Sequence, residues 1–246
     1  MRRLAVALAF LTRLPMPGPT PADAAEVGRA VVFFPVAGAV LGAILAASAR
    51  LLSPRFPPTL CAALLVALLA LLTGALHLDG LADMADGFGG GTTREDVLRI
   101  MRDHSIGTYG ASAIVLTLAL KAAAIAALLA AGTACRWLIL APALARWVPV
   151  ALGTFLAYAR HGGGLGTTVT DHRGLGEFVG ATALAVLLSV CAARLRGLIA
   201  FGAVAAWGLA HGVACKRRIG GVTGDTLGAA TETAEVVALL VAVALA

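Results

Sequence analysis

Three aspartates lie close together directly after an apolar stretch of the chain. Asp79, Asp83 and Asp86 follow the apolar run 60–76 within the short segment 77–87. If that segment is helical, the three side chains occupy positions i, i+4 and i+7 and share one face. Carboxylates this close repel one another, and a divalent cation would relieve the repulsion. Because hard oxygen ligands suit Mg²⁺ or Mn²⁺ rather than zinc, the spacing predicts a magnesium or manganese site.

A second acidic group lies near the end of the chain. Asp225, Glu232 and Glu235 are separated by seven and three residues, which places them broadly on one face of a helix. Glu232 and Glu235 enter an apolar run, where an unpaired carboxylate is costly. A bound metal ion, or pairing with Arg or Lys, would remove that cost.

A polar turn separates the aspartate segment from the next apolar run. Arg102, Asp103 and His104 stand immediately before this run. The guanidinium of Arg102 suits bidentate phosphate recognition. His104 could accept a proton near neutral pH, although a histidine at a helix end also serves as a cap or an interfacial side chain. We therefore treat Asp103 and His104, together with Asp79, Asp83 and Asp86, as candidate catalytic residues, and Arg102 as a candidate substrate ligand.

Two further segments combine basic side chains with several glycines. One is 158–166 and the other is 215–227. The basic triplet of the second has a simpler interpretation as an anchor on the cytoplasmic side of the membrane. The acid-bearing helix that follows it favours a role in binding. The candidate substrate-binding residues of these segments are Arg160, Lys216, Arg217, Gly221 and Gly224.

Most of the chain is apolar, and this property indicates the class of fold. The 246 residues are 60% hydrophobic and 13% charged, with a mean hydropathy of +0.93, which is typical of a polytopic membrane protein. Because a span needs about 20 residues, we expect an all-α integral membrane bundle of about six or seven transmembrane helices, as a single domain over 1–246. The segment 1–15 is expected to be a retained amphipathic or re-entrant segment. The expected spans are 31–52, 60–78, 109–131, 137–157, 178–193, 197–214 and 228–246.

The distribution of Lys and Arg predicts the orientation of the chain. Of the 19 such residues, 12 fall on one side of the expected spans, five on the other and two inside spans. By the positive-inside rule, the richer side and the N-terminus are cytoplasmic. The loops 79–108, 158–177 and 215–227 all fall on this side, so one active site could be assembled from the three. The chain has no basic stripe with interleaved aromatic residues of the kind that binds nucleic acid.

Five segments, in order along nearly the whole chain, carry a resemblance to a known family. They are 10–15, 33–38, 76–87, 100–110 and 219–235. Together they resemble the cobalamin synthase family, the adenosylcobinamide-GDP ribazoletransferases. The resemblance implies a membrane enzyme near the end of vitamin B12 assembly, which joins α-ribazole or its 5′-phosphate to adenosylcobinamide-GDP and releases GMP. It also implies a requirement for a divalent metal, usually Mg²⁺.

The charged residues take specific expected roles under that resemblance. The expected metal ligands, which would hold Mg²⁺ against the pyrophosphate, are Asp79, Asp83, Asp86, Asp225 and Glu232. The expected phosphate clamps are Arg102, Lys216 and Arg217. The implied partners are the two substrates and the lipid bilayer of a bacterial inner membrane, with no nucleic acid, and self-association is left open.

Two other functions are compatible with acidic membrane segments. A CDP-alcohol phosphotransferase also uses several aspartates at helical spacing. Its Asp-Gly pair is usually followed by Ala-Arg three residues on, whereas Asp86-Gly87 precedes Phe88-Gly89-Gly90-Gly91. A transporter also contains buried acids and interrupted helices. A substrate test with CDP-alcohols would identify the first, and ion flux in liposomes would identify the second.

Overall fold

The computed structural model describes residues 2–15, 23–103, 105–160, 167 and 174–246. Within these ranges the named elements are helices, and the only extended pairing is an isolated bridge between Tyr158 and Val222. The predicted all-α class is therefore confirmed. The elements are α1 (Arg2–Leu11), α2 (Ala24–Ala30), the 3₁₀ helix η1 (Val31–Phe33), α3 (Phe34–Leu52), α4 (Pro58–Thr73), α5 (Leu76–Gly90), α6 (Arg94–Ile100), α7 (Thr108–Ala130), α8 (Ala134–Phe155), α10 (Leu175–Ile219) and α11 (Gly224–Ala244).

Several of these helices are long and apolar enough to cross a membrane. In the described part of the chain there are five, or six if α4 and α5 are counted as one bent span. The first is the continuous stretch Ala24–Leu52, which joins α2, η1 and α3, and the others are α7, α8, α10 and α11. Helices suit this role because they satisfy their backbone hydrogen bonds internally. The chain is a multi-pass membrane protein, as its composition predicts.

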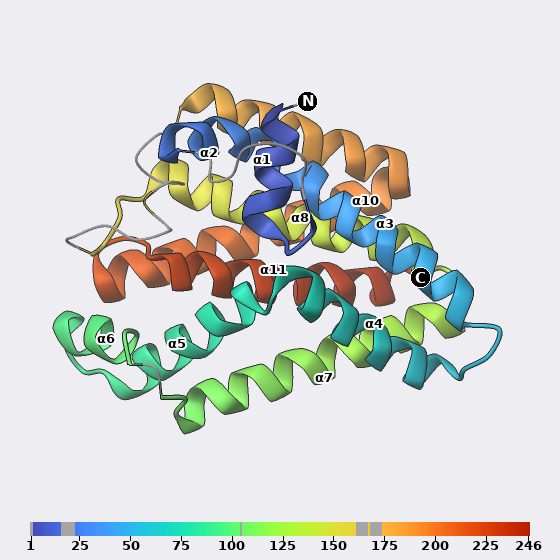
Figure 1. Cartoon of the computed structure of the whole chain (residues 1–246), viewed down its shortest axis with the longest axis horizontal. Coiled ribbons are helices and arrows are strands. Elements are labelled where there is room, and N and C mark those ends of the chain that lie inside the picture. Colours follow the sequence, from blue (N-terminus) through green and yellow to red (C-terminus); the bar gives the residue numbers. More distant parts are fainter. Residues whose placement is uncertain (1, 16–22, 104, 161–166, 168–173) are drawn as a thin grey trace.

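The predicted span 60–78 is broken near its end. α4 ends at Thr73, α5 begins at Leu76, and the two axes differ by 92°. Gly74 and Ala75 both adopt left-handed backbone, with φ of 61° and 57°, which a continuous right-handed helix excludes. Hydropathy does not report such a break, so the predicted end of this span is wrong. The bend directs α5 along α11 (Figure 1).

The helix α10 folds back on itself, so that both of its ends lie on the same side of the molecule (Figure 1). Arg194 has non-helical backbone angles in the middle of its 45 residues. Three residues later, Gly197 lies directly against the Ser189 carbonyl, a contact that a straight helix cannot make. The predicted spans 178–193 and 197–214 correspond to the two arms of α10.

The helices α8 and α11 form the centre of the bundle. α8 packs against α3, α10 and α11. Its side chains Trp137, Leu140 and Leu144 are almost completely buried. α11 also packs against α5 and α7, and its Glu232 and Glu235 are buried.

Four charged side chains are buried together between α7, α8 and α11. Lys121 Nζ lies 2.5 Å from Glu232 Oε2 and 3.1 Å from Glu235 Oε1. Arg146 Nη1 lies 2.5 Å from Glu235 Oε2. We call these four residues the buried ion cluster. Two cations balance two carboxylates, which is the condition for keeping charge at this depth.

Candidate active site

The helices α5 and α11 approach each other most closely around Gly80. A Cβ atom placed on Gly80 would lie 2.8 Å from the carbonyl oxygen of Asp225, and one placed on Gly228 would lie 3.3 Å from His77 Cα. Any side chain at Gly80 would therefore push the helices apart. The close approach brings the first turn of α11 beside the two aspartates of α5 that flank Gly80.

Three aspartates and one arginine meet at this contact. Asp83 is repelled by Asp225 and Asp79 and attracted by Arg160. Arg160 Nη2 lies 2.5 Å from Asp225 Oδ2, and it also donates a hydrogen bond to the Met101 carbonyl at 3.2 Å. The cluster therefore carries more negative than positive charge, as the sequence predicts for Asp79, Asp83 and Asp225.

The donor set of this cluster fits a hard divalent cation. Within the described ranges, no three His, Cys, Asp or Glu side chains already converge as a complete metal site. Mg²⁺ is commonly bound through one or two carboxylates, with its other ligands taken from substrate phosphates and water. Asp79, Asp83 and Asp225 provide such carboxylates, and their mutual repulsion is what a cation would relieve. The cluster therefore fits a cation whose coordination is completed by a phosphorylated substrate.

Asp86 has different partners from the other two aspartates of α5. Its Oδ2 accepts a hydrogen bond from Gly107 N at 2.7 Å, and its Oδ1 accepts one from Gly110 N at 2.8 Å. A Cβ on either glycine would collide with this carboxylate, so the lack of a side chain at both positions lets Asp86 reach the backbone at the start of α7. Asp86 is a cap at the start of α7, favoured by the positive end of the helix dipole. The structure thus gives Asp86 the contacts of a helix cap, and its metal and catalytic roles stay predictions.

Glu232 lies apart from the aspartate cluster, and its metal role stays a prediction. It lies about two turns further along α11 than Asp225. There its carboxylate pairs with Lys121 in the buried ion cluster, at a side-chain exposure of 6%. The sequence left open whether a metal ion or a basic side chain would balance the charge of Glu232. In the structure, a basic side chain does so.

Two arginines hold together the segments that the sequence placed on one side of the membrane. Arg94 Nε donates to the Ile219 carbonyl at 2.9 Å, and Arg94 Nη2 donates to the Ala159 carbonyl at 2.8 Å. Arg218 Nη2 donates to the Phe88 carbonyl at 3.0 Å. The sequence did not predict that these two arginines link the segments. Their partners are backbone carbonyls far away in the chain, and a backbone carbonyl is present at every residue, so no motif marks it.

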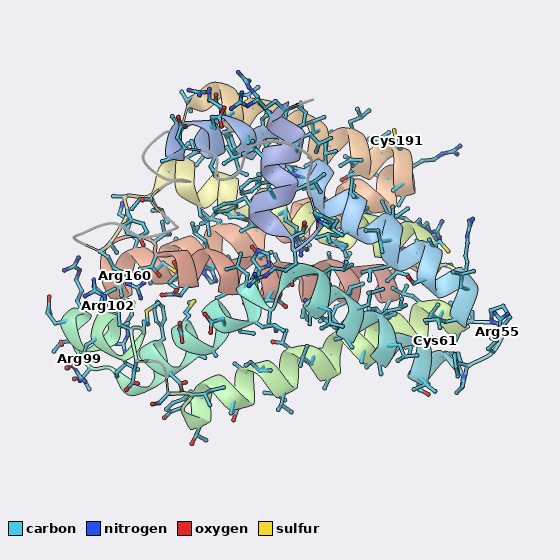
Figure 2. The ribbon with its side chains drawn as sticks, viewed as in Figure 1. Arg55, Cys61, Arg99, Arg102, Arg160 and Cys191 are labelled. Atoms are coloured by element: carbon cyan, nitrogen blue, oxygen red, sulfur yellow. The ribbon has the colours of Figure 1, made fainter. Side chains whose placement is uncertain are left out.

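The remaining predicted phosphate ligands differ in accessibility. Arg102, Lys216 and Arg217 are exposed, and Figure 2 shows Arg102 at the same end of the molecule as Arg160. Gly221 is buried against the Ala157 carbonyl, where a side chain would not fit, and its substrate-binding role stays a prediction. The predicted substrate residue Gly224 begins α11 and lines the pocket described below.

The turn after α6 contains the two remaining predicted catalytic residues. His104 lies outside the described residues, as do 161–166 and 168–173 of the predicted loop 158–177. Asp103 is exposed, and its Oδ1 accepts a hydrogen bond from Ser105 N at 3.0 Å. Their catalytic roles stay predictions. On α6 itself, the Arg99 guanidinium holds the pKa of Asp96 below its usual range, and Asp96 belongs to this local contact rather than to the site.

A pocket of about 510 Å³ opens beside the aspartate cluster. Its walls come from the end of α1 and the two residues after it, the α4–α5 break and the start of α11. Tyr158 and Arg160, which follow α8, and single residues from α3 and α8 complete the lining. Asp79, Asp225 and Arg160 line it, as do Phe10 and Phe34, whose rings stack at 5.8 Å. Sequence analysis did not identify this pocket because its walls are assembled from separate segments.

Comparison with known proteins gives the family of the chain. The model of the cobalamin-5-phosphate synthase family matches residues 3–243. The chain belongs to this family. It is similar to the adenosylcobinamide-GDP ribazoletransferase of Syntrophobacter fumaroxidans, at 41% identity over 95% of this chain and 94% of the relative. It is also similar to that of Pseudomonas paraeruginosa, at 46% identity over 100% of this chain and 98% of the relative. No solved structure matches it.

Membership of the cobalamin-5-phosphate synthase family confirms the resemblance seen in the sequence and identifies the chain as a transferase of cobalamin synthesis. It decides against the two alternatives, a CDP-alcohol phosphotransferase and a transporter. The segments that carry the resemblance include the aspartates at the α5–α11 contact, which places the family's characteristic sequence at the site described above.

The different environments of Asp83 and Asp86 predict different effects of substitution on the stability of the fold. Asp86→Ala leaves two backbone N–H groups of α7 without their acceptor, and we expect a loss of about 1–3 kcal/mol. Asp83→Asn removes a charge from a repulsive cluster, and we expect unchanged or slightly higher stability. Thermal unfolding of the detergent-solubilised variants, at one scan rate, measures both effects. Equal melting temperatures for the two variants would refute the assignment of Asp86 as a cap.

Proposed function

We propose that this chain joins α-ribazole, or its 5′-phosphate, to adenosylcobinamide-GDP and releases GMP. Two of the similar proteins carry the name adenosylcobinamide-GDP ribazoletransferase. The observation that supports the proposal most strongly is the meeting of Asp79 and Asp83 from α5 with Asp225 from α11 beside a pocket of about 510 Å³. A pyrophosphate substrate requires such a site, because displacement at its phosphorus depends on positioning the reactants and neutralising the charge of the phosphates.

The proposed reaction is a displacement at phosphorus. A hydroxyl oxygen of α-ribazole attacks the phosphorus next to the cobinamide arm and forms a new P–O bond. The P–O bond to the guanylate breaks, its electron pair leaves with GMP, and the hydroxyl proton is lost. Negative charge increases on the leaving phosphate during this step, so cationic groups beside the phosphates lower the barrier.

The residues of the cluster have distinct tasks in this proposal. Bound Mg²⁺, held by Asp79, Asp83 and Asp225, would neutralise the pyrophosphate and stabilise the leaving GMP. Arg160 keeps Asp225 in place through their contact at 2.5 Å. Its Nε atom is buried and has no hydrogen-bond partner among the described residues, so it remains free to donate to a phosphate. The exposed Arg102, Lys216 and Arg217 would attract the phosphates at the entrance.

We further propose that the site faces the cytoplasm from the inner membrane of a bacterium. The excess of Lys and Arg in the loops around the site supports this orientation through the positive-inside rule. The bilayer would then hold the spanning helices while the nucleotide substrate enters from the aqueous side.

The proposal is tested by the release of GMP from adenosylcobinamide-GDP and α-ribazole 5′-phosphate, with the full chain purified into nanodiscs. We expect GMP and the coupled corrinoid in equal amounts, no release after chelation by EDTA, and recovery when Mg²⁺ is restored. A CDP-alcohol in place of adenosylcobinamide-GDP serves as the control donor. Absence of GMP release by the folded protein would overturn the proposed function.

The close approach of α5 and α11 makes Gly80 a sensitive position. Gly80→Ala places a Cβ 2.8 Å from the Asp225 carbonyl oxygen, so the acids must move apart. Because small displacements of catalytic groups are costly, we expect kcat/KM to fall about 10- to 100-fold. The matched control is Gly90→Ala at the end of the same helix, where the nearest atom to the new Cβ lies 3.5 Å away. Equal activity of the two variants would contradict the proposed geometry.

A further inference from the structure

The pocket beside the aspartate cluster has chemically different sides. Asp79, Asp225 and Arg160 supply charge on one side. The remaining lining contains apolar side chains, among which Phe10 and Phe34 form a stacked pair, together with Arg13, His77, Tyr158 and three threonines. Such a pocket suits a ligand with an apolar aromatic part and a polar end that reaches the charged groups.

The size of the pocket distinguishes between the two substrates. Pockets of about 300–1,000 Å³ hold ligands of drug size. The volume of about 510 Å³ lies in this range and suits a single nucleoside. It is too small for a corrinoid macrocycle with its attached nucleotide. The candidates of the right size are therefore the acceptor nucleoside and the guanosine part of the donor.

The threonine hydroxyls of the lining bear on the choice between these two nucleosides, because their donors are already used within the chain. The hydroxyls of Thr12, Thr73 and Thr231 already donate to the Leu8, Leu69 and Leu227 carbonyls of their own helices, at 2.7, 3.0 and 2.9 Å. Guanine carries several donors and acceptors on its edge, and burying them without partners is costly. A methylated benzimidazole, the base of α-ribazole, has a single free ring nitrogen and an otherwise apolar surface.

Besides Arg160 Nε, a second buried polar atom of the lining has no partner among the described residues. His77 is only 5% exposed, and its Nδ1 atom makes no hydrogen bond among the described residues. Buried ring nitrogens in proteins are normally satisfied, so an unpartnered one on a residue that lines a pocket is a candidate to bind a ligand. His77 lies two residues before Asp79, on the helix that carries the aspartates.

We propose that this pocket binds the acceptor nucleoside, with its aromatic base between α1 and the α4–α5 break and with His77 Nδ1 hydrogen-bonded to it. The inference rests on the proposed function and adds a binding site to it. The ribose then lies toward Asp79 and Asp225, where its hydroxyl can reach the phosphate. His77 is a substrate-binding residue in this arrangement, and α1 is a wall of the acceptor site.

The test compares the KM values for the two substrates in four variants of the full chain in nanodiscs. We expect His77→Leu to raise the KM for α-ribazole 5′-phosphate about tenfold, the effect of one lost hydrogen bond. His77→Gln, which keeps a hydrogen-bonding group, should stay within about threefold of the wild type. Ala9→Trp should raise the same KM at least tenfold by filling the pocket, whereas Ala5→Trp, one turn earlier on α1 and outside the pocket lining, should not. The KM for adenosylcobinamide-GDP should be unchanged in all four.

The possible outcomes separate this inference from the proposed function. If His77→Leu and Ala9→Trp instead raise the KM for adenosylcobinamide-GDP, the pocket holds guanosine, and the inference is overturned while the function stands. If all four variants have wild-type KM values for α-ribazole 5′-phosphate, the pocket does not bind it. If the wild-type protein releases no GMP at all, the proposed function itself has failed.

Discussion

Asp225→Asn is expected to reduce GMP release by about 10³-fold, with little loss of folded protein. The change removes the only one of the clustered aspartates that comes from α11, and it breaks the ion pair with Arg160 at 2.5 Å. Loss of one preorganised electrostatic group at a reacting phosphate or carbonyl typically costs about 10²–10³ in rate. We place Asp225 at the upper end because it also positions Arg160. Single-turnover assays with both substrates saturating measure the effect on the chemical step.

The matched control for this prediction is Glu95→Gln on α6. It is also an acid-to-amide change, at a side chain that is 78% exposed and lies 3.6 Å from Arg94. Exposed pairs of this kind contribute about 0–1 kcal/mol, so activity should be close to that of the wild type. If Asp225→Asn retains as much activity as Glu95→Gln, Asp225 has no part in the reaction.

Lys121→Met is expected to be the most destabilising of the proposed substitutions. It removes one of two cations from the buried ion cluster and leaves Glu232 without its partner at 2.5 Å. Breaking a buried pair from one side typically costs about 3–5 kcal/mol, because the remaining charge stays desolvated. Thermal unfolding in detergent, followed by tryptophan fluorescence at a fixed scan rate, should show a fall of several degrees in the apparent melting temperature.

The double variant Lys121→Met with Glu232→Gln provides the internal control. It restores charge balance in the cluster, since Arg146 still faces Glu235 at 2.5 Å. We expect it to be more stable than Lys121→Met alone, although it has lost more native groups. A double variant that is less stable than the single one would mean that charge balance is not what holds this cluster together.

Much of the fold could be predicted because it depends on patterns within single segments. Apolar runs gave the positions of the spanning helices, including the two arms of α10 on either side of Arg194. The break at Gly74 and Ala75 could not be predicted in this way, because the backbone turns inside a run that remains apolar on both sides. Hydropathy records burial in the membrane and is insensitive to a change of direction.

The site was predictable in part for the same reason. The spacing of Asp79 and Asp83 indicates a shared helical face, and the acid of α11 that the sequence grouped with them, Asp225, does lie beside them. The same reasoning gave Asp86 and Glu232 metal roles, whereas one caps α7 and the other pairs with Lys121. Spacing tells which residues can meet on one helix, but the partners of these two come from other helices.

The central claim is that the acids of α5 and α11 form one site that binds a divalent cation together with a phosphorylated substrate. Mn²⁺ binding by electron paramagnetic resonance tests it most directly, on the wild type and on Asp83→Asn and Asp225→Asn, each with adenosylcobinamide-GDP present. We predict that the wild type binds Mn²⁺ and that each substitution alone weakens this binding at least tenfold. Wild-type Mn²⁺ affinity in Asp225→Asn would contradict the claim, because the two helices would then not share a cation.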